Sequence, residues 1–265
     1  MDKELELILE ELIKDFKNMK EVAAISFAGS STSKRNDSLS DIDIDIFTYS
    51  DISVELREKI ISKYAEYKEV GNDYWGQGDE FILKNKNIPI DIAYFGISWI
   101  EDIVNNILAN YNASVGYSTC FWYNIKNSDI IFDREGRFAK LKEISNCKYP
   151  VKLKKNIIEK NYPLLKNNIS SYYNQISKAI SRSDINSINH RLAGFMASYF
   201  DIIFAINEIP HPGEKRLINI IKNTCTKIPK NFEEDINNIL KSAGNLDNEL
   251  LVKLDSLIDN LDDVI

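Results

Sequence analysis

Three aspartates, Asp41, Asp43 and Asp45, alternate with isoleucines in the stretch SDIDIDIF. Side chains two residues apart on a β-strand share one face and are separated by roughly 6.5–7 Å along the strand, so this stretch predicts three carboxylates on one face. Carboxylates that close repel one another, and each raises the pKa of its neighbours unless a cation lies between them. Aspartate is also disfavoured within strands. The pattern therefore indicates a cation site, with a solvated polar strand face as the alternative.

Two common motifs, one at the aspartates and one just upstream, do not fit this sequence. A calcium-binding EF-hand loop that began at Asp41 would need glycine at its sixth position and glutamate at its twelfth, where Ile46 and Ile52 stand. The upstream stretch GSSTSK is not a phosphate-binding P-loop, because Ser33 replaces the glycine that precedes the lysine. Gly29 and Ser30 can still serve a phosphate, since glycine permits close approach of the backbone and Ser30 can donate a hydrogen bond.

The combination of Gly29-Ser30, ten intervening residues and Asp41-Ile-Asp43-Ile resembles the signature of the nucleotidyltransferase superfamily related to DNA polymerase β. The resemblance covers about residues 22–95. It implies that Asp41 and Asp43 hold Mg²⁺, two ions being expected, which arrives with a nucleoside triphosphate, ATP being the expected one. It also implies that Gly29 and Ser30 contact the phosphates. Many family members carry a basic residue at the place of Ser33, so Lys34 or Arg35 is a candidate for the triphosphate contact.

A third carboxylate is expected from a later strand. The stretch IPIDIAYF supplies Asp91, which the resemblance implies as a metal ligand, as the base for the acceptor hydroxyl, or as both. Glu80, in the preceding stretch DEFIL, is the reserve candidate. Asp45 stands where the family has an aliphatic residue, which leaves Asp43 with Asp45 as an alternative working pair. The tetrapeptide Ser-Asp-Ile-Asp at 40–43 favours Asp41 and Asp43 as the working pair.

The periodicity of apolar residues predicts the elements that position these groups. We expect the following in chain order: a helix over 3–18, strands over 22–29 and 41–49, a helix near 52–67, a hairpin from DEFILK to IPIDIAYF, a helix over 98–110, and a strand, turn and helix start over 129–141. After Pro150 the period is helical almost throughout, with a long helix from Asp184 to Asn207. We therefore predict an α+β protein, with a mixed-sheet catalytic domain over 1–149 and an all-α bundle over 150–265.

The charge, cysteine content and apolar runs of the sequence indicate which kinds of partner are expected. The net charge is -7, which argues against a broad nucleic-acid groove and makes a nucleic-acid partner unexpected. The three cysteines are widely spaced and form no zinc or disulfide pattern. The first residues read as an acidic amphipathic helix rather than a signal peptide, and no apolar run reaches the roughly 20 residues of a membrane span. We expect a cytoplasmic monomer or homodimer without a membrane partner.

The layout of a catalytic domain followed by a helical bundle resembles small antibiotic nucleotidyltransferases. The resemblance implies a small hydroxyl-bearing acceptor, for which an aminoglycoside or lincosamide antibiotic is a candidate, and a helical domain that forms an acceptor-pocket wall or a dimer contact. Transfer to tRNA or protein and an inactive nucleotide-binding scaffold are the alternatives. Glu214, Lys215 and Arg216 are expected either to reach phosphates or to be solvated at a helix start. The sequence assigns no role to His190 or His211. The aromatic stretch GYSTCFWYN is expected either to line a pocket or to lie in the core.

Overall fold

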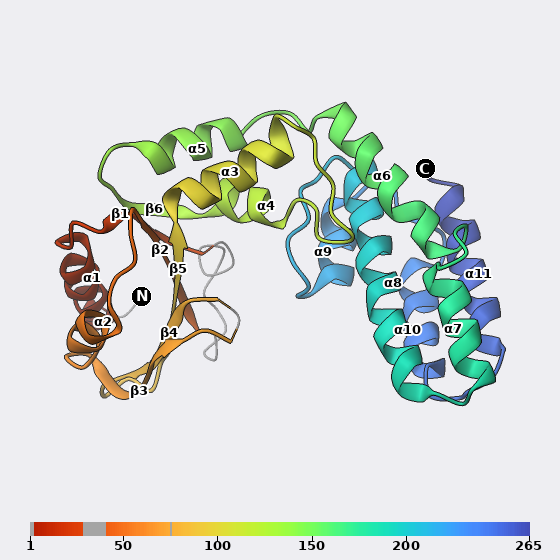
Figure 1. Cartoon of the computed structure of the whole chain (residues 1–265), viewed down its shortest axis with the longest axis horizontal. Coiled ribbons are helices and arrows are strands. Elements are labelled where there is room, and N and C mark those ends of the chain that lie inside the picture. Colours follow the sequence, from red (N-terminus) through yellow and green to blue (C-terminus); the bar gives the residue numbers. More distant parts are fainter. Residues whose placement is uncertain (1–2, 29–40, 75) are drawn as a thin grey trace. The chain divides into compact units, whose positions relative to one another are not determined.

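The structure, a computed structural model, describes residues 3–28, 41–74 and 76–265 (Figure 1). Gly29, Ser30, Lys34 and Arg35, the four predicted nucleotide-binding residues, lie outside the described residues. Asp41 is the first residue described after this gap. The α+β class predicted from the sequence is confirmed, because a mixed sheet is followed by a long helical region.

The chain divides into two compact units. The first combines the residues up to 105 with 124–147, and the second combines 106–123 with 148–265. The second unit thus resumes two residues before Pro150, where the sequence places the start of the helical domain. It also includes 106–123, which the sequence analysis assigned to the catalytic domain.

In the first unit, six strands of the described part of the chain form one sheet in the order β3-β4-β5-β2-β1-β6. Strands β2 and β5 are parallel, and the other neighbouring pairs are antiparallel. The strands are β1 (Val22–Phe27), β2 (Ile42–Thr48), β3 (Ala65–Asn72), β4 (Gly78–Leu83), β5 (Pro89–Gly96) and β6 (Asp129–Asp133). The predicted hairpin is confirmed, because β4 and β5 are antiparallel neighbours joined by a short turn.

Two helices, α1 (Lys3–Lys17) and α2 (Val54–Ile61), cover one face of this sheet (Figure 1). The isoleucines that alternate with the aspartates on β2 are buried in the same core as the apolar side of α1. Ile90 and Ile92 on β5 join that core and are almost fully buried. Burial of one alternate set of residues leaves the other set, which contains the aspartates, on the opposite face.

Three further helices lie near the last two strands in the sequence. Helix α3 (Ile97–Leu108) follows β5, α4 (Cys120–Asn127) precedes β6, and α5 (Arg137–Ser145) follows β6. Helices α3 and α5 match the helices expected over 98–110 and after the turn near residue 135. The helix predicted near 52–67 is too long, because α2 ends at Ile61 and β3 begins at Ala65. Strand β3 lies at the edge of the sheet, and among its residues only Ala65 is buried. Its sequence therefore has no apolar alternation that would distinguish it from a helix.

The contact between α2 and the sheet includes a buried ion pair. Arg57 on α2 and Asp79 on β4 are 1% and 0% exposed, and Nη1 of Arg57 lies 3.1 Å from Oδ1 of Asp79. The Tyr94 hydroxyl donates a hydrogen bond of 2.6 Å to Asp79, and the Gly71 amide donates one of 2.7 Å. The Arg57 guanidinium also lies 4.6 Å from the centre of the Tyr94 ring. These contacts connect α2, β3, β4 and β5 at one point.

The helical unit is built around its longest helix, α8. Its helices are α6 (Val151–Leu165), α7 (Tyr172–Ser181), α8 (Ile185–Ile206), α9 (Leu217–Thr224), α10 (Phe232–Ser242) and α11 (Glu249–Asp262). Asp184 caps the start of α8 through a hydrogen bond from the Ser187 amide, and Asn207 is its C-cap, which confirms the predicted limits of the long helix. From Phe195 to Ile206 nearly every side chain of α8 is buried.

A buried polar cluster holds the segment before α4 against α6 and α8. Asp201 of α8 accepts hydrogen bonds from the Ser118 amide at 3.0 Å and from the Ser118 hydroxyl at 2.6 Å. Asn161 of α6 accepts a bond from the Gly116 amide at 2.9 Å and donates one to the Ser114 carbonyl at 3.0 Å. The segment is thus fixed by side chains of the helical unit, which explains why 106–123 belongs to that unit.

The buried carboxyl of Asp201 is expected to make the free energy of unfolding depend on pH. Burial raises the pKa of Asp201 to about 6, with the Ser118 hydrogen bonds acting in the opposite direction. Because the folded state binds this proton more tightly than the unfolded chain, the free energy of unfolding falls as pH rises from about 4 to about 6. Across this window we expect the free energy of unfolding of the wild type to fall by about 2–3 kcal/mol more than that of Asp201→Asn. Denaturant titration at several pH values measures both. A wild-type-to-variant difference that is constant with pH would contradict this assignment.

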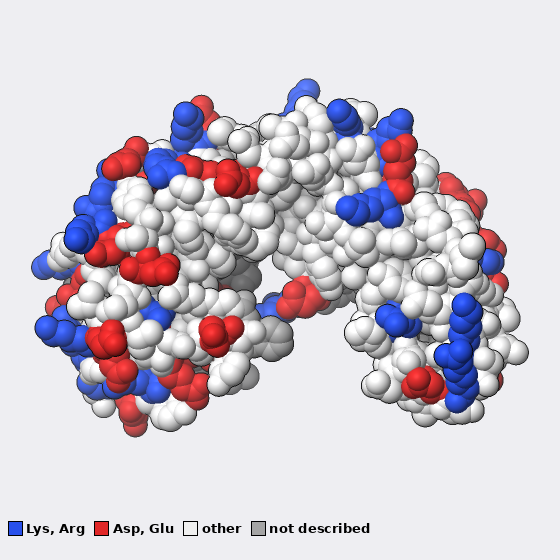
Figure 2. All heavy atoms as spheres, viewed as in Figure 1, with Lys and Arg blue, Asp and Glu red and all other residues white. Residues whose placement is uncertain are grey.

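No helix in the described residues is both long enough and apolar enough to cross a membrane. On the face of the molecule that Figure 2 shows, Lys and Arg side chains of the described residues are interspersed with Asp and Glu. The visible charges therefore lack the continuous basic stripe of a nucleic-acid groove.

Candidate active site

A row of carboxylates crosses the sheet on the face opposite α1 and α2. Asp43 on β2 lies directly opposite Asp91 on β5, Asp91 lies opposite Glu80 on β4, and Glu80 lies opposite Glu69 on β3. Neighbouring strands are about 4.8 Å apart, and directly opposed residues point to the same side of a sheet. Four acidic residues from four strands thus share one line across one face.

The parallel pairing of β2 and β5 joins two residues that are far apart in the sequence. Asp43 and Asp91 are 48 positions apart in the sequence, yet they are register partners. Asp91 is exposed and Asp43 is half-buried. Glu80, the reserve candidate of the sequence analysis, is next to Asp91 and accepts a hydrogen bond of 3.3 Å from the Asn72 side-chain amide.

The other two aspartates of the alternating stretch are placed differently. Asp41 is exposed and lies just before the start of β2. Asp45 is half-buried within β2 and lies opposite Ala93, so no acidic residue of β5 faces it directly. The pairing of β2 with β5 therefore brings Asp43 and Asp91 together, with Asp41 and Asp45 on either side of Asp43 along the strand.

The electrostatics of Asp45 reflect this crowding. Burial, together with the negative charges of Asp43 and Asp91, raises the pKa of the Asp45 carboxyl to about 7. Negative charge on this face is therefore costly in the absence of a cation. This is the repulsion expected from the sequence, and a bound cation would relieve it.

The donor set on this face suits a hard cation. Carboxylate oxygens are preferred by Mg²⁺, which proteins usually hold through one or two carboxylates together with substrate phosphates. Asp43 and Asp91 supply two such groups at adjacent strand positions. Within the described residues, no three His, Cys, Asp or Glu side chains are grouped so as to hold a metal ion by themselves. A cation held by Asp43 and Asp91 would need further ligands from water or a substrate.

Aromatic residues occupy the same face further along β2 and β5. Phe47 and Phe95 continue the alternation that begins with Asp43 and Asp91, and their ring centres are 5.9 Å apart. Phe47 also contacts Phe138 of α5 at 4.3 Å, and Phe95 stacks on Trp99 of α3 at 6.0 Å. The face therefore changes from carboxylates to aromatic packing within four residues of each strand.

The residues singled out in the helical half have other surroundings. Glu214, Lys215 and Arg216 are exposed immediately before α9, and Glu214 and Arg216 line a pocket of the helical unit. His211 is fully buried, its Nδ1 accepts a hydrogen bond from the Gly213 amide at 3.1 Å, and burial lowers its pKa to about 4. In the aromatic stretch GYSTCFWYN, Trp122 is buried whereas Tyr117 lies at the same pocket.

Two features of this site were not predicted from the sequence. Glu69 is one of them, because the helix expected near 52–67 covers only the start of β3 and no element is predicted for the residues after it; the pairing with Glu80 places Glu69 in the row. Phe47 and Phe95 were also not connected with the aspartates. The signal for the second feature was present, since each phenylalanine follows an aspartate at an even spacing on its strand.

Comparison with known proteins gives a distant structural similarity. No family model matches the chain, and no curated protein matches it. A crystal structure of a nucleotidyltransferase-like protein from Exiguobacterium sibiricum 255-15 is similar over 96% of this chain and 74% of that one, with 11% sequence identity and a TM-score of 0.44. A similarity this distant does not establish a family.

Proposed function

We propose that the protein is a metal-dependent nucleotidyltransferase that moves a nucleoside monophosphate from a nucleoside triphosphate, ATP being the expected one, to a hydroxyl of a small molecule. The observation that supports this most directly is the register pairing of Asp43 with Asp91 on parallel neighbouring strands. It joins the alternating aspartate stretch to the single later carboxylate that the resemblance to the polymerase β superfamily implies. An aminoglycoside or lincosamide antibiotic is a candidate acceptor.

The residues of this face have separate tasks in the proposed reaction. Asp43 and Asp41 would hold a Mg²⁺ ion that arrives with the substrate, and Asp91 would contribute a further ligand oxygen. When bound, Mg²⁺ offsets charge on the triphosphate and on the attacking oxygen. In this proposal Asp91 also accepts the proton of the acceptor hydroxyl, the oxygen then attacks the α-phosphorus, and pyrophosphate leaves. Because the carboxylates on this face repel one another, their charges favour a bound cation.

The direct test is a transfer assay with the full chain. The protein is incubated with each α-labelled nucleoside triphosphate, Mg²⁺ and separate panels of antibiotic, tRNA and protein acceptors. We expect label on a small hydroxyl-bearing acceptor with release of pyrophosphate, and loss of transfer when EDTA is added. Label on tRNA or protein alone would overturn the proposed acceptor class. Absence of Mg²⁺-dependent nucleotide binding would overturn the proposed function itself.

Asp91→Asn separates chemistry from binding. A general base matters only when the hydroxyl loses its proton, so we expect kcat to fall by about 10²–10⁴-fold while nucleotide affinity changes much less. Turnover across a metal titration and nucleotide affinity by calorimetry measure the two effects. Partial recovery at high Mg²⁺ or with Mn²⁺ would assign Asp91 mainly to metal binding.

Glu69→Gln is the matched control, because Glu69 lies in the same row but on the edge strand, two strands from β5. We expect it to retain most of the wild-type turnover. A wild-type rate in Asp91→Asn would remove Asp91 from the site and direct the same measurements to Glu80.

A further inference from the structure

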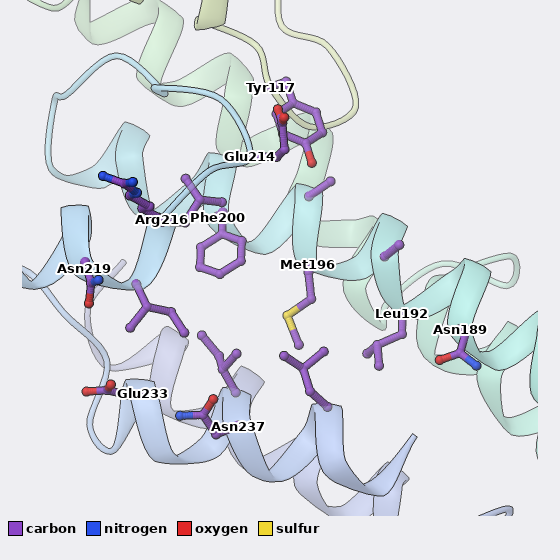
Figure 3. A pocket seen from close by; sticks show the side chains of 16 residues that line it. Tyr117, Asn189, Leu192, Met196, Phe200, Glu214, Arg216, Asn219, Glu233 and Asn237 are labelled. Carbon is purple, nitrogen blue, oxygen red and sulfur yellow. The ribbon is translucent and has the colours of Figure 1, made fainter. Parts of the chain in front are cut away.

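A cavity of about 630 Å³ opens into the helical unit between α8, α9 and α10 (Figure 3). Its volume lies within the roughly 300–1,000 Å³ of small-molecule sites. The floor is apolar, and polar side chains surround it. The apolar residues that line it include Leu192, Met196, Phe200, Leu217, Ile236 and Leu240. Every residue of the lining belongs to the helical unit.

One end of the cavity is formed by Tyr117, whose position is set by the buried cluster around Asp201. Tyr117 lies between Gly116, bonded to Asn161, and Ser118, bonded to Asp201. Its own backbone is left-handed, with φ of 55°, a conformation that is uncommon for a bulky side chain. A Cβ on Gly116 would lie 2.9 Å from Cβ of Ala197, so the segment is pressed closely against α8. The fold therefore fixes the backbone of Tyr117, while its side chain is 43% exposed and its ring centre lies 5.0 Å from that of His211.

The charged group beside Tyr117 at this end of the cavity is the carboxylate of Glu214. Glu214 lies beside Tyr117 in Figure 3, and after burial its negative charge is the largest contribution that raises the pKa of the Tyr117 hydroxyl. Glu233, the other acidic residue of the lining, pairs with Lys222 at 2.5 Å. No ion pair of Glu214 is found among the described residues. Arg216 also lines the cavity, but its guanidinium points away from Phe200 and Met196 in Figure 3.

We propose that this cavity binds a small amphipathic amine. Its apolar body lies on the floor formed by Met196, Phe200 and Ile236, and its ammonium group pairs with Glu214. The ring of Tyr117 provides an aromatic surface beside the ammonium group, which adds a cation–π attraction. An ion pair that a bound ligand shields from water is stronger than an exposed one, so Glu214 selects the sign of the ligand charge. The proposal is independent of nucleotidyl transfer.

Three probes of equal ring size test the proposal on the full chain: 1-naphthaleneethylamine, neutral 1-naphthaleneacetamide and anionic 1-naphthaleneacetate. Calorimetry or ligand-observed NMR measures each affinity. We expect the amine to bind at least about tenfold more tightly than the acetate. Glu214→Gln should weaken amine binding about tenfold and leave acetamide binding within about twofold. Ala193→Phe should weaken all three, because Ala193 is an exposed residue of the lining and a larger side chain there fills the cavity.

Glu234→Gln is the matched control, since Glu234 is an exposed neighbour of Glu233 on α10 that does not line this cavity. It should bind the amine as wild type does. Equal binding of amine and acetate, or tighter binding of acetate, would overturn the assigned ligand charge. Amine binding unchanged in Ala193→Phe would place the ligand elsewhere. Sedimentation that shows dimers dissociated by Ala193→Phe would assign the cavity to a second copy of the chain and overturn the small-molecule site.

Discussion

Asp43→Asn is expected to reduce nucleotidyl transfer by roughly 10³-fold or more, which corresponds to about 4 kcal/mol of transition-state stabilisation. Asp43 is the residue of the alternating stretch that faces Asp91 directly, so its loss removes one of the two paired carboxylates. Asparagine has nearly the same shape, and the residue lies on the face opposite the apolar core. We therefore expect the melting temperature to change by only a few degrees, or to rise because a like charge is removed.

Transfer of labelled nucleotide to the acceptor measures this effect, and slow Mg²⁺-dependent hydrolysis is the readout if no acceptor is known. Asp41→Asn and Asp45→Asn should be assayed beside it. Loss of activity in Asp41→Asn with activity retained in Asp45→Asn would support the pair Asp41 and Asp43. The reverse result would identify Asp43 and Asp45 as the working pair. Full activity in Asp43→Asn would refute the proposed site.

Asp79→Ala is expected to lower the free energy of unfolding of the sheet unit by about 3–5 kcal/mol. The substitution leaves the Arg57 guanidinium, which is 1% exposed, without its carboxylate. It also removes the acceptor of the Tyr94 hydroxyl and the Gly71 amide. An unpaired buried charge is far more costly than an empty ion-pair site at the surface. Urea titration followed by circular dichroism measures the loss, and the first unit is expected to unfold at the lower urea concentration.

Two controls make this prediction specific. Glu58, on the same helix as Arg57, pairs with Lys68 of β3 at 3.3 Å near the surface, and Glu58→Ala should cost less than about 1 kcal/mol. The double variant Arg57→Met with Asp79→Leu removes both buried charges and should recover part of the stability lost in Asp79→Ala. A loss below 1 kcal/mol in Asp79→Ala would show that the pair contributes little to holding α2 on the sheet.

Local sequence was sufficient to predict which face of each central strand meets the core. The isoleucines of β2 and β5 recur at every second residue, and burying them requires the aspartates between them to point the other way. The limits of α8 were equally predictable, because Asp184 and Asn207 act at its two ends and the segment between them is strongly apolar. Both predictions depend on residues within one element, where period and capping are decided by near neighbours.

Tertiary structure alone decided which residues of different strands lie opposite one another. A shift of two residues between β2 and β5 would keep every side chain on its face, yet it would place Asp41 or Asp45, rather than Asp43, opposite Asp91. Strand β3, the pairing of Glu80 with Glu69, and the ion pair between Arg57 and Asp79 were likewise not predicted from local pattern. The reason is physical: alternation has a period of two and is unchanged by such shifts, whereas register is set by the packing of whole strands against the helices and against each other.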